Sequence, residues 1–294
     1  MSKISFIKSD DRYYNIERCL SLIKGEIISG IKEAKRIVIH PNCLTDHNQL
    51  ASTHADALYA LLDFIYPYAK TQITLAEGTE SGSTLQAFKN YNYLEFQDKF
   101  DLAIVDLNDD ETETVELLDK NGNPCKASIS KTMIQADFII SITPPKTHNL
   151  LTYSGIIEST VTSSILRPKV GGISRFLRSQ SSKPLIIDTD PDITAENIQK
   201  IYNLLKIRLS VIDAFTSMQA EGPINGEMVP SHFAIASSEV SAAEWLACRC
   251  LGFPVANIPY LKTLGIDTDN GHFVIGDDWR KNITPIKMSA KFIS

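Results

Sequence analysis

Short apolar runs rich in β-branched residues alternate with segments that have apolar residues at helical spacing. This alternation is typical of a mostly parallel sheet flanked by helices, and it predicts an α/β fold. The dipeptide Asn121-Gly122 separates two strand-like runs and predicts a β-hairpin inserted near residues 113–129. We expect strands at 36–42, 71–82, 101–111, 136–144 and 232–238, helices at 53–70, 84–91 and 238–252, and a strand, a helix and a strand across 183–215.

The pattern changes after the run SITPPKTHNL at residues 141–150. Beyond this run the apolar spacing is less regular, and Pro168, Gly171 and Gly172 interrupt it. We therefore expect two lobes. The N-terminal α/β lobe spans residues 1–148 and carries the hairpin, and the C-terminal α/β lobe spans residues 149–294.

Composition favours a globular protein that acts on a small molecule. Hydrophobic residues make up 43% of the chain and charged residues 22%, as in ordinary globular proteins. The net charge of -6 argues against a nucleic-acid partner, because phosphate contacts need a clustered basic surface. No window approaches the roughly 20 apolar residues of a membrane span, and the N-terminus lacks a signal-peptide stretch. We expect a cytoplasmic protein without a membrane partner, and the sequence leaves its oligomeric state open.

Several cofactor motifs are missing from the sequence. The five cysteines include no CxxC pair, so neither an iron–sulfur cluster nor a zinc knuckle is indicated. No GxGxxG or GxxxxGK[ST] motif follows a strand, so a nucleotide cofactor is not indicated either. The acidic run Asp188, Asp190 and Asp192 lacks the glycine and the final glutamate of a calcium loop.

The loops after the expected strands hold most of the candidate site residues. In an open parallel sheet, ligands bind beyond the carboxyl ends of the strands. Four of the six histidines lie in two such loops or at one helix start. The candidates are His40, Asn42, Asp46 and His47 after the first strand, His54 at the helix start, Glu77 after the second strand, Lys146 and His148 after the fourth, and Asp213, Glu221, Gly222 and Gly226 near the last long strand.

The stretch around Lys146 and His148 carries the clearest signal. Pro144 and Pro145 fix two φ angles and remove two donors, so we expect the strand to end and a stiff loop to begin. Lys146 can bind an anion there, and His148 can exchange a proton near neutral pH. The alternative is a lysine and a histidine exposed in a surface loop.

The other candidates have structural interpretations as well. His54 in a first helical turn can pair with a neighbouring carboxylate, and His47 can be a solvated loop residue. His40 can satisfy backbone groups, and Glu77 can be an exposed strand terminus. Gly222 and Gly226 allow close backbone approach to a ligand, whereas a structural glycine has the same permissive backbone.

Several segments together resemble the family known as domain of unknown function 362. The resemblance runs from about Ile37 to about Gly276. It implies an α/β fold and, through a distant similarity to the lactate racemase superfamily, histidines and lysines that act on small hydroxy acids between two α/β domains. The matching segments are HPN at 40–42, THADAL at 53–58, ITLAEGTESG at 73–82, ADFIISITPPKTH at 136–148, DAFTSMQAEGPINGE at 213–227, and SEVSAAEWLACRCLG with the following IPYLKTLGI.

The chain departs from the family pattern at several positions. Many relatives carry a ferredoxin-like cysteine cluster, which this sequence lacks. Glu158 stands where the family has a lysine, which inverts a charge. Glu239 and Glu244 stand where the family has two aspartates. The resemblance therefore implies the fold more firmly than it implies a reaction.

The sequence leads to two functional hypotheses. The first is a small-molecule enzyme of the isomerase, lyase or cyclase type that uses acid–base or metal-assisted chemistry on a carboxylate-bearing metabolite. The second is a non-catalytic accessory protein that binds a metabolite or a metal. In the first, His54, Lys146, His148 and Glu221 are catalytic, Asn42, Glu77, Asp213, Gly222 and Gly226 bind the substrate, and His47, His54 and His148 are candidate ligands for a divalent metal.

Overall fold

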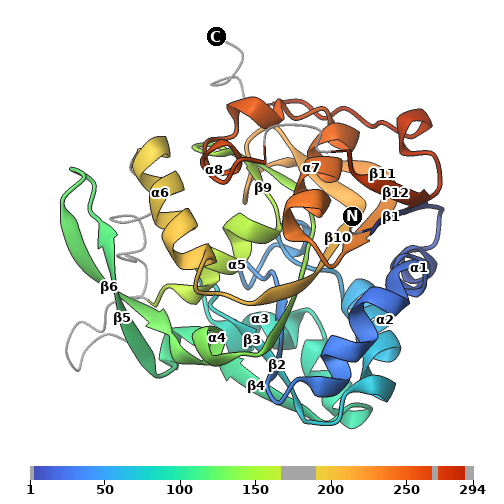
Figure 1. Cartoon of the computed structure of the whole chain (residues 1–294), viewed down its shortest axis with the longest axis horizontal. Coiled ribbons are helices and arrows are strands. Elements are labelled where there is room, and N and C mark those ends of the chain that lie inside the picture. Colours follow the sequence, from blue (N-terminus) through green and yellow to red (C-terminus); the bar gives the residue numbers. More distant parts are fainter. Residues whose placement is uncertain (1–2, 167–189, 267–270, 289–294) are drawn as a thin grey trace.

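One large sheet runs through the molecule and joins strands from both ends of the chain (Figure 1). The computed structural model describes residues 3–166, 190–266 and 271–288. Within these ranges eight strands lie side by side in the order β12-β1-β11-β10-β7-β2-β3-β4, the short strand β8 pairs with β10, and β9 pairs with β8. The strands are β1 Lys3–Lys8, β2 Ile37–Pro41, β3 Ile73–Glu77, β4 Leu102–Asp106, β5 Thr112–Leu118, β6 Pro124–Ser130, β7 Phe138–Thr143, β8 Lys146–His148, β9 Thr152–Ser154, β10 Ile207–Gln219, β11 Glu227–Ser237 and β12 Phe273–Gly276.

The helices cover both faces of the sheet. They are α1 Arg12–Glu33, α2 Ala55–Ile65, α3 Thr84–Asn90, α4 Lys131–Gln135, α5 Ile156–Ser164, α6 Pro191–Tyr202, α7 Val240–Leu251 and α8 Pro259–Thr263. The core residues of α1, α2 and α3 pack with Ile37 and Ile39 of β2. The core residues of α5, α6, α7 and α8 pack with Val38, which lies between Ile37 and Ile39 in β2. Successive strand residues point to opposite faces, so the two helix groups lie on opposite sides.

The centre of the sheet is parallel, which confirms the predicted fold class. Strands β10, β7, β2, β3 and β4 run in one direction. Strand β11 is antiparallel to both of its neighbours, β10 and β1, and β1 is parallel to β12. All five residues of β2, IVIHP, are buried. Strands covered on both faces read as continuous apolar runs in this way.

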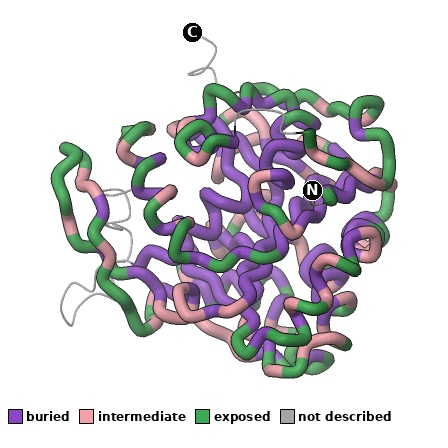
Figure 2. The backbone as a smooth tube through the Cα atoms, in the orientation of Figure 1, coloured by how far each residue is buried: buried purple, intermediate pink, exposed green. Residues whose placement is uncertain are grey.

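The predicted hairpin forms outside the large sheet. Strands β5 and β6 pair antiparallel along their whole length. Gly122 has a φ of +78°, a conformation that glycine adopts without strain. The hairpin projects from the left of the molecule, where much of its surface is exposed (Figure 2).

The predicted boundary at residue 148 does not separate two sheets. Strand β1, from the first half of the chain, pairs with β11 and β12 from the second half. Strand β10 of the second half pairs with β7 of the first. The division into two lobes stays a prediction.

The segment after the two prolines is a correction to the sequence analysis. Lys146–His148 does not form a loop but the short strand β8, which pairs with β9 and with Met218 of β10. The prolines end β7, yet the chain resumes an extended conformation directly after them. Residues two apart in a strand share one side, so Lys146 and His148 still face the same way.

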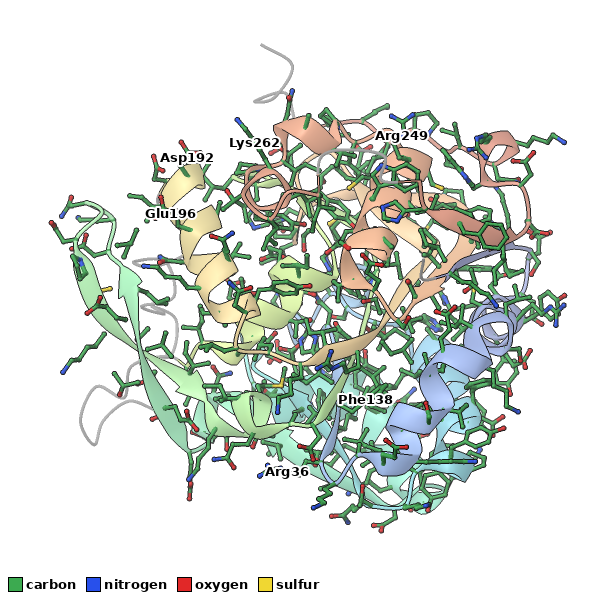
Figure 3. All side chains as sticks on the ribbon, in the orientation of Figure 1. Arg36, Phe138, Asp192, Glu196, Arg249 and Lys262 are labelled. Atoms are coloured by element: carbon green, nitrogen blue, oxygen red, sulfur yellow. The ribbon has the colours of Figure 1, made fainter. Side chains whose placement is uncertain are left out.

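The acidic run near residue 190 starts a helix. Asp190 caps α6, and its side chain accepts from the backbone N–H groups of Asp192 and Ile193. Asp192 and Glu196 are exposed and point outward from α6 (Figure 3). Asp188, Pro168, Gly171 and Gly172 lie outside the described residues, as does the strand expected at the start of the segment 183–215. No described helix is both long and apolar enough to cross a membrane.

Candidate functional site

Two separate cavities lie near the carboxyl ends of the parallel strands. We name the first the central pocket; its walls include Asn42, Glu77, His148, Glu158 and Ser163. We name the second the Arg12 cleft; its walls include Arg12, His54 and Asp213. The central pocket lies under α5, whereas the cleft lies at the starts of α1 and α2. These helices cover opposite faces of the sheet, so the sequence candidates divide into two groups.

Glu77 anchors a buried polar network in the wall of the central pocket. Its carboxylate accepts from the backbone N–H groups of Cys43 at 2.7 Å and Gly78 at 2.6 Å. His40 Nε2 lies 3.2 Å from the same carboxylate and 2.9 Å from Ser163 Oγ. Ser163 also bonds to Glu77. Glu77 is therefore buried rather than an exposed strand terminus, and it ties the ends of β2 and β3 to α5.

Backbone hydrogen bonds determine which ring nitrogen of His148 carries the proton. Its Nδ1 accepts from the N–H groups of Leu150 and Leu151, at 3.2 Å each. A ring nitrogen that accepts two N–H groups carries no proton, so the neutral ring holds its proton on Nε2. His148 is buried and lines the central pocket. It can therefore act there as an N–H donor.

Lys146 is the most unusual residue of this region because its side chain has no exposed surface. Its Nζ donates to the carbonyl of Pro144 at 3.2 Å. Burial lowers the pKa of Lys146 to about 8, and the nearby charges of Glu158 and Glu77 oppose this shift. A lysine with such a pKa exchanges its proton close to neutral pH.

Glu158 is the carboxylate most strongly coupled to Lys146. It lies in the first turn of α5 and accepts from Ser154 Oγ at 2.5 Å. Burial raises the pKa of Glu158, while Ser154 and the Lys146 ammonium lower it. The pair thus combines an acid and a base whose pKa values both move toward neutrality.

An unsatisfied acceptor marks the inside of the central pocket. Asn42 Oδ1 is buried and has no hydrogen-bond partner among the described residues. A buried carbonyl without a donor is costly, so this oxygen is suited to a donor on a ligand. The cavity measures about 20 Å³, which is room for about one water molecule.

His54 and Asp213 lie in the Arg12 cleft and not in the central pocket. His54 is the N-cap of α2, and its Nδ1 accepts from Asp56 N–H at 3.2 Å. Asp213 is buried and pairs with Arg12 Nε at 3.2 Å. The single site that the sequence analysis assembled from His54, Lys146 and His148 is therefore not formed in this structure.

The glycine-rich loop packs on β8. Gly222 N–H donates to Thr147 Oγ1 at 3.2 Å. A Cβ at Gly222 would lie 2.2 Å from the Thr147 carbonyl oxygen, and one at Gly226 would lie 2.4 Å from the Gln219 carbonyl oxygen. Contacts within the protein thus account for both glycines, and their substrate contacts stay predictions. Glu221 is exposed, while Pro223 of the same loop lines the central pocket.

The three histidines proposed as metal ligands are not gathered. The side chain of His47 is 65% exposed and pairs with Asp46, whereas His54 and His148 lie in different cavities. Within the described ranges, no group of three or more His, Cys, Asp or Glu side chains is arranged to hold a metal ion.

Residues of α5 and the N-terminus were not among the predicted site residues. Glu158, Ser159, Thr162 and Ser163 line the central pocket, and Arg12 lines the cleft. A signal for α5 is present in the sequence. The run ESTVTSS at 158–164 is rich in hydroxyl groups, although most of its residues are buried. Arg12 had no comparable signal, because its partners Asp213 and Thr216 lie two hundred and more residues away.

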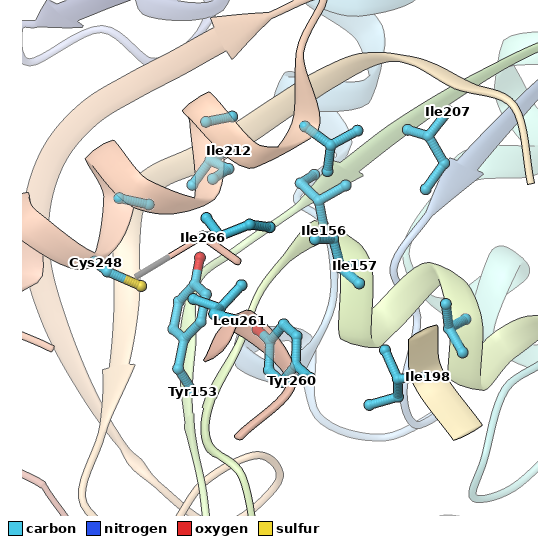
Figure 4. Packing of buried hydrophobic residues seen from close by; sticks show 14 of the residues in the cluster. Tyr153, Ile156, Ile157, Ile198, Ile207, Ile212, Cys248, Tyr260, Leu261 and Ile266 are labelled. Atoms are coloured by element: carbon cyan, nitrogen blue, oxygen red, sulfur yellow. The ribbon is translucent and has the colours of Figure 1, made fainter. Parts of the chain in front are cut away.

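Glu244 of α7 contacts the start of α5. Its Oε1 accepts from Ile157 N–H at 2.8 Å, which satisfies a donor at the start of α5. Burial raises the pKa of Glu244 to about 7. Tyr153, Ile156 and Cys248 belong to the apolar core that α5 and α7 share (Figure 4). Glu239, the other departure from the family pattern, is the N-cap residue of α7.

Similarity to solved structures extends over most of this chain. The lactate racemase apoprotein from Thermoanaerobacterium thermosaccharolyticum is 17% identical, with a TM-score of 0.50 over 86% of this chain and 57% of that one. A protein from Thermotoga maritima is 12% identical, with a TM-score of 0.47 over 88% of this chain and 60% of that one. The chain therefore spans less than two thirds of either protein, and at these identities the likeness shows the fold alone.

No curated protein of similar sequence was found. The family described as Domain of unknown function (DUF362) matches residues 37–249. This match covers more than half of the chain and agrees with the resemblance seen in the sequence. The chain therefore belongs to the DUF362 family.

Proposed function

We propose that the central pocket is the active site of an enzyme that removes and returns a proton beside the carboxylate of a small metabolite. The reaction is of the isomerisation type, because the proton that leaves the carbon returns to the substrate. The substrate carries a hydroxyl or amino group next to the carboxylate. This proposal uses only side chains of the chain itself.

The burial of Lys146 and Glu158 within reach of each other's charge is the observation that supports the proposal most strongly. Glu158 lines the central pocket, whereas Lys146 is fully buried and does not line it. Burying two ionisable groups costs free energy that a purely apolar packing would avoid. Their pKa values move toward neutral pH from opposite sides, which suits groups that exchange protons during catalysis.

Glu158, Lys146, His148 and Asn42 each have a role in this proposal. Glu158, oriented by Ser154, takes the proton from the carbon, and the Lys146 ammonium keeps Glu158 charged before the transfer. His148 Nε2–H donates to the substrate carboxylate, which gains negative charge as the proton leaves. Asn42 Oδ1 accepts from the neighbouring hydroxyl or amino group.

Entry of a substrate requires the pocket to widen, because about 20 Å³ holds only about one water. The loop that carries Pro223 forms one wall. It is held by the bond from Gly222 to Thr147 and by a bond from Asn48 Nδ2 to the Ile224 carbonyl. We propose that this loop moves outward when substrate binds.

Deuterium exchange tests the proposal without knowledge of the product. The protein is incubated in D₂O with a panel of 2-hydroxy and 2-amino carboxylates, and loss of the proton on the carbon beside the carboxylate is followed by NMR. Wild type should exchange at least one compound. Glu158→Gln should lower that rate by at least roughly 100-fold, because removal of a general base typically has an effect of this size.

Two further variants complete the test. Lys146→Met should also abolish exchange, whereas Lys131→Met, which changes an exposed lysine paired with Glu111, should exchange at the wild-type rate. Full exchange by Glu158→Gln would refute the assigned base. A compound that raises the melting temperature of wild type without any exchange would instead support the non-catalytic binding protein.

A further inference from the structure

We propose that the Arg12 cleft is a second small-molecule site, separate from the central pocket, which binds a small organic anion with an apolar body. The cleft has a volume of about 330 Å³, within the range of small-molecule sites. It lies on the face of the sheet covered by α1 and α2. The inference does not depend on the function proposed for the central pocket.

Two side chains that line the cleft, Arg12 and His54, each have an N–H group without an acceptor among the described residues. Arg12 Nε bonds to Asp213 and Nη2 donates to Thr216 Oγ1 at 3.1 Å, but Nη1 has no hydrogen-bond partner among the described residues. His54 Nδ1 accepts from Asp56 N–H at 3.2 Å and lies 3.5 Å from the Asp56 carboxylate. The neutral ring that accepts this N–H carries its proton on Nε2, which has no partner in the described part of the chain. Two N–H groups thus remain for an anionic ligand.

Arg12 is held in place by its neighbours. Asp213 is buried and fixes the guanidinium from one side. The Phe215 ring lies under it, with the guanidinium carbon 4.7 Å from the ring centroid. Only 12% of the Arg12 side chain is exposed. A rigid and largely desolvated arginine binds a carboxylate or phosphate more strongly than a mobile surface arginine.

Charged groups around the cleft affect the protonation of His54. Burial lowers the pKa of His54 and Arg12 lowers it further, while Asp56 and Asp213 raise it. The imidazole is therefore neutral near pH 7 while the cleft is empty. A bound anion offsets the repulsion from Arg12 and lets His54 take up a proton.

The remaining walls of the cleft select an apolar body. Leu50, Pro144, Phe215 and Met228 line it, and Met228 is 65% exposed. An exposed large apolar side chain beside a fixed cation is suited to a ligand that has a charged group at one end and an apolar group at the other. An inorganic ion would leave these apolar surfaces in water.

Calorimetric titration tests this site with four probes. Benzoate and phenyl phosphate carry the expected chemistry, while benzyl alcohol and benzylamine replace the anion by a neutral group and a cation. We expect wild type to bind at least one of the two anions and neither of the other probes. Failure of both anions to bind, or equal binding of benzyl alcohol, would overturn the proposal.

Two variants locate the bound anion. His54→Asn removes the imidazole but keeps an effective N-cap residue for α2, and it should weaken binding by roughly 10-fold through loss of one charge-assisted bond. The double variant Arg12→Met with Asp213→Asn removes both charges together, so no buried charge is left alone, and it should abolish binding. Wild-type affinity in both variants would contradict the assignment.

A variant of the central pocket separates the two sites. Lys146→Met, which should lose the exchange reaction proposed above, should retain wild-type affinity for the anion because Lys146 does not line the cleft. If this variant alone abolished anion binding, the probe would occupy the central pocket and the second site would be refuted.

Discussion

Lys146 places an ionisable group where water does not reach, and this affects the stability of the protein as pH changes. Its pKa falls from 10.5 to about 8 because burial disfavours the ammonium. Between these values the unfolded chain holds a proton that the folded chain does not. Stability rises with pH wherever the unfolded state binds more protons, so the contribution of Lys146 becomes more favourable between about pH 8 and pH 10.5.

Lys146→Met should remove this contribution. Relative to the variant, the unfolding free energy of wild type should rise by at most roughly 3.5 kcal/mol across that window, from about 1.4 kcal/mol for each pKa unit. Urea unfolding at a series of pH values measures the difference. Parallel curves for wild type and variant would contradict the burial of a titrating lysine.

Glu244 changes the unfolding free energy with pH in the opposite direction. Burial raises its pKa from 4.5 to about 7, so the folded chain holds a proton that the unfolded chain loses between these values. The unfolding free energy should therefore fall as pH rises from about 4.5 to about 7. Glu244→Gln keeps an oxygen for Ile157 N–H and should lose this slope, becoming more stable relative to wild type by roughly 2–3 kcal/mol at neutral pH. A slope equal to that of wild type would show that Glu244 does not titrate there.

At the scale of residues, sequence reasoning found groups that follow a strand directly. Asn42, Glu77 and His148 were predicted because the ends of parallel strands share one edge, and the structure places all three at one pocket. It did not find groups whose partners are distant in sequence, such as Arg12, which pairs with Asp213. His54 caps the start of its own helix, and the local sequence does not distinguish this role from catalysis.

At the scale of elements, two glycines of α1 give a matched test of packing. A Cβ at Gly25 would meet nothing within 4 Å, whereas one at Gly30 would lie 2.7 Å from the ring of Phe138 in β7 (Figure 3). Gly25→Ala should raise the unfolding free energy by roughly 0.5–1 kcal/mol, because alanine favours the helix. Gly30→Ala should lower it by roughly 1–3 kcal/mol through overpacking.

Thermal or urea unfolding of the two variants checks this pair. Because both changes occur in the same helix and have the same effect on intrinsic propensity, the difference between them isolates the contact with Phe138. Equal effects would show that α1 does not lie against β7 at Gly30.

The helix α1 itself was not predicted, although its signal is in the sequence. Ile16, Leu20, Ile23, Ile27 and Ile31 are buried at spacings of three and four, as in an amphipathic helix. Gly25 and Gly30 fall within this pattern, and glycine is unfavourable inside a helix, which weakens the helical signal. The strand β8 was missed for another reason, because three residues are too few to show a period and only its partners define it.

At the scale of the whole molecule, the parallel centre was predictable, and the order of the strands was not. Alternating strands and helices determine the fold class. The position of β7 between β10 and β2 depends on packing between segments far apart in sequence. For the same reason the sequence placed all candidates around one site, whereas the sheet separates them onto two faces.

The position of β1 has a consequence for how the protein is made. Ser5 of this strand bonds to Ala236, 231 residues further along the chain, and its neighbours β11 and β12 are both synthesised late. Strands β2, β3, β4 and β7 can associate while translation continues, but β1, which precedes them in the chain, cannot pair until β11 and β12 have been made. During this interval the unpaired β1 can associate with strands of other chains. A chaperone that covers β1 until β11 is made would prevent this aggregation.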